Sequence, residues 1–155
     1  MRRAITALTM GPARQALVIE AAASLLAARL RLRLRSFGRI TAELGRFVPP
    51  APAPAPVGAP VPVDPVRRRR ISQIRWAIAV AAPLMPFRAV CLQRSLAGRA
   101  MLARRGIDAI LHFGGTVRAG APDSEHAWLT ADGIGVAGYP IDPAMVEIGR
   151  IVPRG

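Results

Sequence analysis

The chain contains no lysine, a single cysteine and few aromatic side chains. All 22 basic residues are arginines, and 5% of the residues are aromatic. One cysteine, Cys91, excludes an internal disulfide and any redox or metal motif built on paired cysteines. The scarcity of aromatics, together with the lack of zinc-finger spacing or an RNP-like pattern, argues against nucleic-acid binding. A lone cysteine is most often a small buried apolar residue, so its neighbours must decide its role.

Acidic residues are also scarce, and this leaves a formal net charge of +13. Such a charge attracts acidic peptides, anionic lipids or other polyanions without selecting one of them. A membrane span needs about 18–20 uninterrupted apolar residues, and the nearest candidate, Ala16 to Ala28, is interrupted by Glu20. We expect a cytoplasmic protein.

The composition divides the chain into three parts. Residues 1–48 predict an N-terminal helical region, because Ala13 to Arg35 consists mainly of good helix formers after Pro12. Residues 49–66 form a proline-rich linker, in which alternate prolines exclude both helix and sheet. Residues 67–155 are long enough for a small domain. No internal repeat is present.

The N-terminal helix is basic and amphipathic. An apolar stripe follows steps of four and three residues, through Leu26, Leu30, Leu34 and Phe37. We expect this stripe to pack against the rest of the protein, and peripheral contact with a membrane surface is the alternative.

The third part begins with helices and ends with strands. Four arginines, Arg67 to Arg70, predict a solvated cluster, and Ile71, Ile74 and Ile78 recur with helical spacing until Pro83 and Pro86. A further helix is predicted over 91–104, with Gly106 as its left-handed cap. Alternating apolar residues predict strands over 107–115 and 126–130. Asp132-Gly133 predicts a hairpin turn that leads into a return strand over 134–139. This order predicts an α+β fold.

Cys91 and His126 are the candidate catalytic pair. The break at Pro86 places Cys91 in the first turn of its helix, where the helix dipole favours a thiolate. His126 lies at the start of a strand, and Trp128 shares its face and shields the imidazole from water. A lone histidine on a strand is more often structural than catalytic, so the pairing carries the hypothesis. The other histidine, His112, is given no role.

Three motifs carry a specific resemblance. The segments CLQRSLA (91–97), LARRGIDA (102–109) and HAWL (126–129) occur in the order found in the transglutaminase-like leader peptidases of lasso-peptide biosynthesis, the B-type proteins. The stretch from Glu20 to Leu44 resembles their short N-terminal helical region. The chain therefore resembles this family over most of its length outside the linker.

The resemblance implies a transglutaminase-like or papain-like cysteine-peptidase core, in which a helix bearing the cysteine packs on a small antiparallel sheet. It implies a Cys-His-Asp site that removes the leader from a ribosomally made precursor. The expected partners are the precursor peptide, an asparagine-synthetase-like cyclase and a separate leader-recognition protein. No cofactor is expected to bind directly, and ATP is consumed by the cyclase.

The third catalytic residue departs from the family pattern. The usual acidic position on the next strand falls at or near Gly138. We assign the role to Asp142, just beyond it, and a backbone carbonyl or a water could serve instead. Two alternative functions are compatible with the same fold. The protein could be a non-catalytic scaffold that binds the precursor or cyclase, or it could be a transglutaminase or acyltransferase that passes the acyl group to an amine.

Overall fold

The computed structural model describes residues 11–50, 63–116 and 125–154. The helices are α2 (Pro12–Leu34), α3 (Phe37–Leu44), α4 (Pro65–Ala81), the 3₁₀ turn η1 (Ala82–Leu84) and α5 (Cys91–Ala103). The strands are β1 (Arg46–Val48), β2 (Ile110–Thr116), β3 (Glu125–Ala131), β4 (Ile134–Ala137) and β5 (Met145–Val152). The α+β fold expected from the sequence is confirmed.

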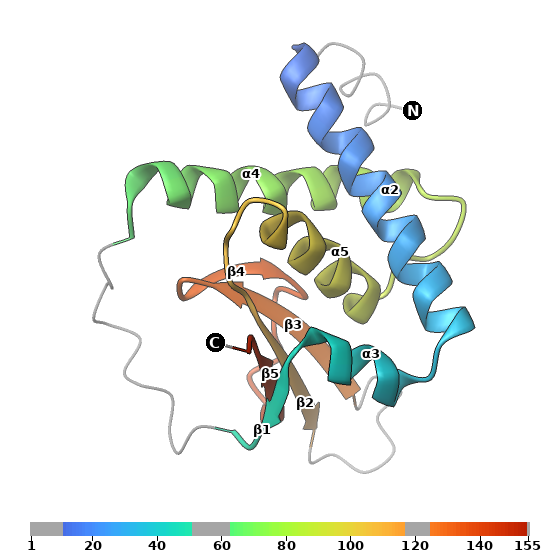
Figure 1. Ribbon diagram of the computed structural model, residues 1–155, viewed down its shortest axis with the longest axis vertical. Coiled ribbons are helices and arrows are strands. Elements are labelled where there is room, and N and C mark those ends of the chain that lie inside the picture. Colours follow the sequence, from blue (N-terminus) through green and yellow to red (C-terminus); the bar gives the residue numbers. More distant parts are fainter. Residues whose placement is uncertain (1–10, 51–62, 117–124, 155) are drawn as a thin grey trace.

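The strands form one antiparallel sheet in the order β1-β5-β2-β3-β4. Helices α2, α4 and α5 lie together on one side of this sheet (Figure 1). Helix α5 contacts β3 and β4, while α2 crosses α5 and α4 on its outer side. The cysteine-bearing helix α5 therefore lies at the centre of the core, in contact with the sheet, α2 and α4, while α4 also contacts β4 directly.

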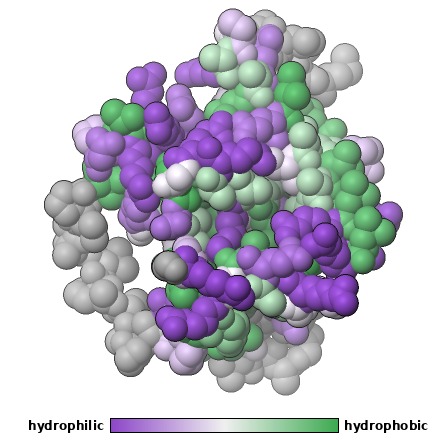
Figure 2. Space-filling view, in the orientation of Figure 1, coloured by the Kyte–Doolittle hydropathy of each residue, from purple (hydrophilic) through white to green (hydrophobic). Residues whose placement is uncertain are grey.

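Helix α4 forms where the isoleucine spacing predicted a helix. Asp64 caps its start, since the carboxylate accepts from the backbone N–H groups of Val66 at 3.4 Å and Arg67 at 3.2 Å. The apolar face is fully buried and consists of Ile71, Ile74, Ala77, Ile78 and Ala81. The polar face carries the predicted arginine cluster, and hydrophilic surface extends over α4 (Figure 2).

Helix α2 packs with a different face from the one predicted. Its buried positions are Val18, Ala21, Ser24, Leu25 and Ala28. The leucine stripe faces solvent, with Leu30 47% and Leu34 81% exposed, and apolar surface is visible at the right-hand edge of the molecule, where α2 lies (Figure 2). The buried face combines Val18 and Leu25 with alanine and serine, and it contacts α5 and α4.

The N-terminal region also supplies a strand, which the sequence analysis missed. Strand β1 pairs with β5, with Arg46 opposite Val152 and Val48 opposite Arg150. Arg99 of α5 reinforces this attachment, because its guanidinium donates to the carbonyl of Ala109 at 2.9 Å and to the carbonyl of Leu44. Burial is the main cause that lowers the Arg99 pKa.

The hairpin between β3 and β4 is as predicted. Asp132 and Gly133 have φ angles of 49° and 74°, as a tight two-residue turn requires. The helix over 91–104 and its left-handed cap at Gly106 (φ 65°) are likewise confirmed. Strand β5 is a further element that the sequence analysis missed.

The division of the chain into three parts stays a prediction. Residues 51–62 of the proline-rich segment lie outside the described residues, so its extended conformation is untested. Within the described ranges, no helix combines the length and apolar character needed to cross a membrane.

Candidate active site

Cys91 is the first residue of α5, as predicted. The preceding segment is fixed on the helical layer, since the guanidinium of Arg29 lies 4.4 Å from the centroid of the Phe87 ring and Ala89 is buried. The side chain of Gln93 closes the helix start by accepting from the backbone N–H of Val90 at 3.3 Å. Cys91 is partly exposed, forms no disulfide and lines a cavity at the N-terminus of this helix.

His126 lies on β3 with a defined orientation. Its Nε2 is 2.6 Å from the carbonyl oxygen of Gly138. Because a carbonyl only accepts, Nε2 carries the proton in this bond. The neutral ring therefore has its lone pair on Nδ1, which is the nitrogen left to accept a proton.

Gly138 holds its carbonyl in place through a backbone shape that only glycine fits. Its φ is +81°, in the left-handed region. A Cβ at this position would lie 2.4 Å from the carbonyl oxygen of Ala127 and 2.7 Å from the Cα of Trp128. The position at which the resemblance led us to expect an acidic side chain thus supplies a backbone acceptor.

A ring stack supports the other side of the imidazole. Trp128 stacks on His126 with ring centroids 6.2 Å apart and also stacks on His112 at 5.3 Å. His112 contacts Glu147 through Nδ1 at 2.6 Å and Thr130 through Nε2 at 2.8 Å. Burial lowers the pKa of His112, and the contact with Glu147 opposes this shift. Sequence analysis gave His112 no role, and the structure links it to the candidate base through Trp128, which stacks on both histidines.

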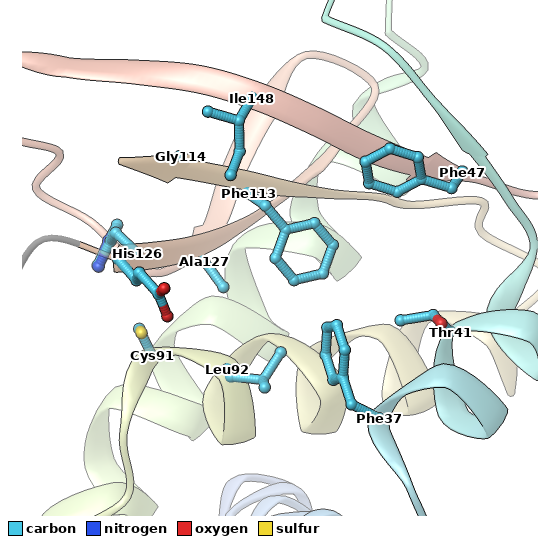
Figure 3. A pocket seen from close by; sticks show the side chains of 11 residues that line it. Phe37, Thr41, Phe47, Cys91, Leu92, Phe113, Gly114, His126, Ala127 and Ile148 are labelled. Carbon is cyan, nitrogen blue, oxygen red and sulfur yellow. The ribbon is translucent and has the colours of Figure 1, made fainter. Parts of the chain in front are cut away.

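Cys91 and His126 line the same cavity, which has a volume of about 560 Å³. The sulfur and the imidazole lie at one end, Phe37 lies in the middle, and Phe47 lies toward the other end (Figure 3). Within the described part of the chain, no hydrogen bond joins the thiol to the imidazole. Hydrogen bonds between catalytic groups are often long before substrate binds, so this separation is compatible with a catalytic pair.

Asp142 is not brought to the imidazole. Its carboxylate accepts from the backbone N–H of Ala144 at 2.8 Å, within the turn that precedes β5. Over the described ranges, the hydrogen-bond partner of His126 is Gly138, and Asp142 does not line the cavity. In the same ranges, no cluster of three or more metal-binding side chains is present.

A comparison with protein families matches residues 22–147 to the transglutaminase-like superfamily. The chain belongs to this superfamily. Neither a curated protein nor a solved structure gives a significant match. The superfamily generally includes cysteine peptidases, and the transglutaminase-like domain of this chain has the corresponding α+β fold.

The transglutaminase-like match begins within α2 and includes the N-terminal segment that carries α3 and β1. These two elements supply Phe37 and Phe47 to the cavity, and β5 supplies Ile148. Sequence reasoning did not assign these residues to the site. The available signal was the β-branched residues Val146, Ile148, Ile151 and Val152 in β5, while β1 is too short to be recognised alone.

Proposed function

We propose that the protein is a cysteine peptidase with Cys91 as nucleophile and His126 as general base. The observation that carries the proposal is the placement of both residues at one end of a single cavity, with Nε2 of His126 bonded to Gly138. A histidine held in one tautomer, in the same cavity as a thiol at a helix N-terminus, supplies the two groups that thiol acylation requires. We assign the orienting role to the Gly138 carbonyl rather than to Asp142.

In the proposed reaction, Nδ1 of His126 takes the proton of the Cys91 thiol. The sulfur attacks the scissile carbonyl carbon, and a C–S bond forms as the carbonyl electrons move to oxygen. Backbone N–H groups in the first turn of α5, which have no intrahelical partner, stabilise this oxyanion. His126 then protonates the leaving amine, the C–N bond breaks, and a thioester remains on Cys91.

Water completes the cycle. His126 takes a proton from the water as its oxygen attacks the thioester, and the C–S bond breaks to release a carboxylic acid and the free enzyme. The Gly138 carbonyl is neutral, so it orients the imidazole without adding a negative charge to balance the imidazolium. It therefore replaces one of the two contributions that a carboxylate makes in a Cys-His-Asp site.

We propose that the substrate is the leader-bearing precursor of a lasso peptide. The support is the motif order CLQRSLA, RRGIDA and HAWL, which resembles the leader peptidases of that pathway. On this proposal the protein acts in the cytoplasm with an asparagine-synthetase-like cyclase and a separate leader-recognition protein. The net charge of +13 favours encounter with an acidic leader.

The test is cleavage of the precursor encoded beside the gene, with the recognition protein supplied and the products identified by mass spectrometry. Wild type is compared with Cys91→Ala and His126→Ala. We expect leader release by wild type and none by either variant. Equal processing by all three proteins would refute the catalytic assignment and support the scaffold alternative.

The acyltransferase alternative shares the same acylation step. Supplying a primary amine during the reaction distinguishes it, because an acyltransferase yields an amide where a peptidase yields a carboxylic acid. The presence of a single cysteine makes the labelling of Cys91 by an electrophile unambiguous in either case.

A further inference from the structure

The cavity continues well beyond the Cys91–His126 pair, and its far part is apolar. The large apolar side chains that line it are Phe37, Phe47, Leu92, Phe113 and Ile148. Three of them are unusually accessible, with Phe37 50%, Phe47 59% and Ile148 61% exposed. Exposed apolar side chains that gather around one cavity typically mark a binding site.

These side chains come from elements far apart in the sequence. Phe37 belongs to α3, Phe113 to β2 and Ile148 to β5. The rings of Phe37 and Phe113 meet edge to face with centroids 5.7 Å apart. Figure 3 shows both rings in the middle of the cavity, next to Leu92, which directly follows Cys91. An apolar surface thus extends from the candidate nucleophile to the N-terminal elements.

The charge of the cavity differs from that of the whole chain. The sequence contains 22 arginines, yet among residues 11–50, 63–116 and 125–154 no arginine lines this cavity, and Glu125, at the His126 end, is the one lining residue of these ranges with a carboxylate. A site of this composition discriminates by apolar contact, not by ionic pairing. Its volume of about 560 Å³ falls within the range of about 300–1,000 Å³ typical of small-ligand sites.

We propose that this cavity is the acyl-donor subsite, which binds a bulky aliphatic or aromatic side chain within two residues of the carbonyl attacked by Cys91. The inference rests on the proposed function, because it requires acylation of Cys91. It adds the class of substrate: peptides with a large apolar residue next to the cleavage site, in preference to glycine or a charged residue.

The experiment uses benzyloxycarbonyl 4-nitrophenyl esters of glycine, alanine, leucine and phenylalanine. Attack by the thiolate forms the C–S bond and expels nitrophenolate, which is followed by absorbance, and the adduct on Cys91 is identified by mass. Each rate is divided by the rate of the same ester with glutathione. We expect corrected rates for leucine and phenylalanine to exceed that for glycine by about 10- to 100-fold.

The outcomes separate the two proposals. Corrected rates that are equal across the series, with Cys91 acylated, would overturn the subsite and leave the peptidase intact. A failure of every ester to acylate Cys91 would overturn the proposed function on which the subsite rests. Cys91→Ala provides the blank.

Strand β5 offers a matched pair of variants. Val146 and Ile148 both belong to β5 and are similarly exposed, at 53% and 61%, but Ile148 lines the cavity and Val146 does not. Ile148→Ala is expected to lower the leucine-to-glycine rate ratio about three- to tenfold, because buried methyl groups are lost from the bound state. Val146→Ala is expected to leave this ratio unchanged. A ratio that Ile148→Ala leaves unaltered, in a protein with wild-type circular dichroism, would contradict the subsite.

Discussion

Replacing Gly138 by alanine tests the contact that orients the candidate base. An alanine at a φ of +81° is destabilised by about 1 kcal/mol relative to glycine. Its Cβ would also lie 2.4 Å from the carbonyl oxygen of Ala127, so the segment after β4 must move away from β3. Overpacking of this kind typically adds about 1–3 kcal/mol. We therefore expect Gly138→Ala to lower the free energy of unfolding by about 2–4 kcal/mol.

Gly106→Ala is the matched control. Gly106 also has a positive φ, of 65°, and a Cβ there would meet no atom within 4 Å. Gly106→Ala should therefore lower the free energy of unfolding by only about 1 kcal/mol, the cost of placing alanine at a positive φ. Urea unfolding followed by the fluorescence of Trp76 and Trp128 measures both free energies.

The catalytic effect is measured under conditions where both variants are folded. Displacing the Gly138 carbonyl releases Nε2 of His126, and a misplacement of about 1 Å at a catalytic group lowers rates by about 100-fold. We expect a loss of this order in Cys91 acylation for Gly138→Ala and none for Gly106→Ala. Equal stability and equal acylation rates for the two variants would refute both the close approach of Gly138 to Ala127 and the role of the Gly138 carbonyl in orienting His126.

Three further predictions concern residues around this core. Glu20→Gln should lower the free energy of unfolding by about 1 kcal/mol at pH 7. The Glu20 carboxylate accepts a hydrogen bond from Arg105 at 2.7 Å, and this bond is the largest of the causes that lower the pKa of Glu20. A carboxylate whose pKa is lowered in the folded state stabilises the protein at pH values above its unfolded-state pKa. The difference in stability between wild type and Glu20→Gln should therefore vanish as the pH falls through the folded-state pKa. Urea unfolding at pH 7 and at low pH measures this difference. Arg99→Lys should lower the free energy of unfolding by about 1–3 kcal/mol, because one ammonium replaces the guanidinium that reaches two backbone carbonyls; an unchanged urea midpoint would contradict this. Asp142→Asn should change precursor cleavage by less than about twofold, because the asparagine oxygen can still accept from Ala144; a large loss would instead support Asp142 as the third catalytic residue.

Helix and hairpin signals were the parts of the fold that local sequence predicted well. The isoleucines at 71, 74 and 78 are all buried, and Asp132-Gly133 forms the turn it predicted. Such signals depend on residues close together in the chain. Cys91 was located for the same reason, since a proline break followed by a helix pattern fixes a helix start within a turn.

Features set by distant partners were not predictable in this way. Strand β1 has three residues, and it is a strand because β5, about one hundred residues later, pairs with it. The packing face of α2 was misassigned because both faces of this helix carry leucine, and the face that packs is set by its contacts with α4 and α5. The acceptor for His126 is a backbone carbonyl, and a search for acidic side chains does not find one.

Because β1 pairs with β5, the parts of the chain before residue 51 and after residue 62 are held together by contacts that do not depend on a continuous backbone between them. Residues 46–48 are held by the ladder with residues 150–152 and by the Arg99 guanidinium. Residues 11–50 and 63–154 therefore meet through strand pairing, through the packing of α2 on α5 and through the walls of the cavity. Two separately made polypeptides that divide between residues 50 and 63 are expected to reassemble, with the cysteine and histidine on one fragment and part of the apolar wall on the other. Exchange of the first fragment between related proteins would then change the selectivity for the apolar side chain of the substrate, while Cys91 and His126 stay the same.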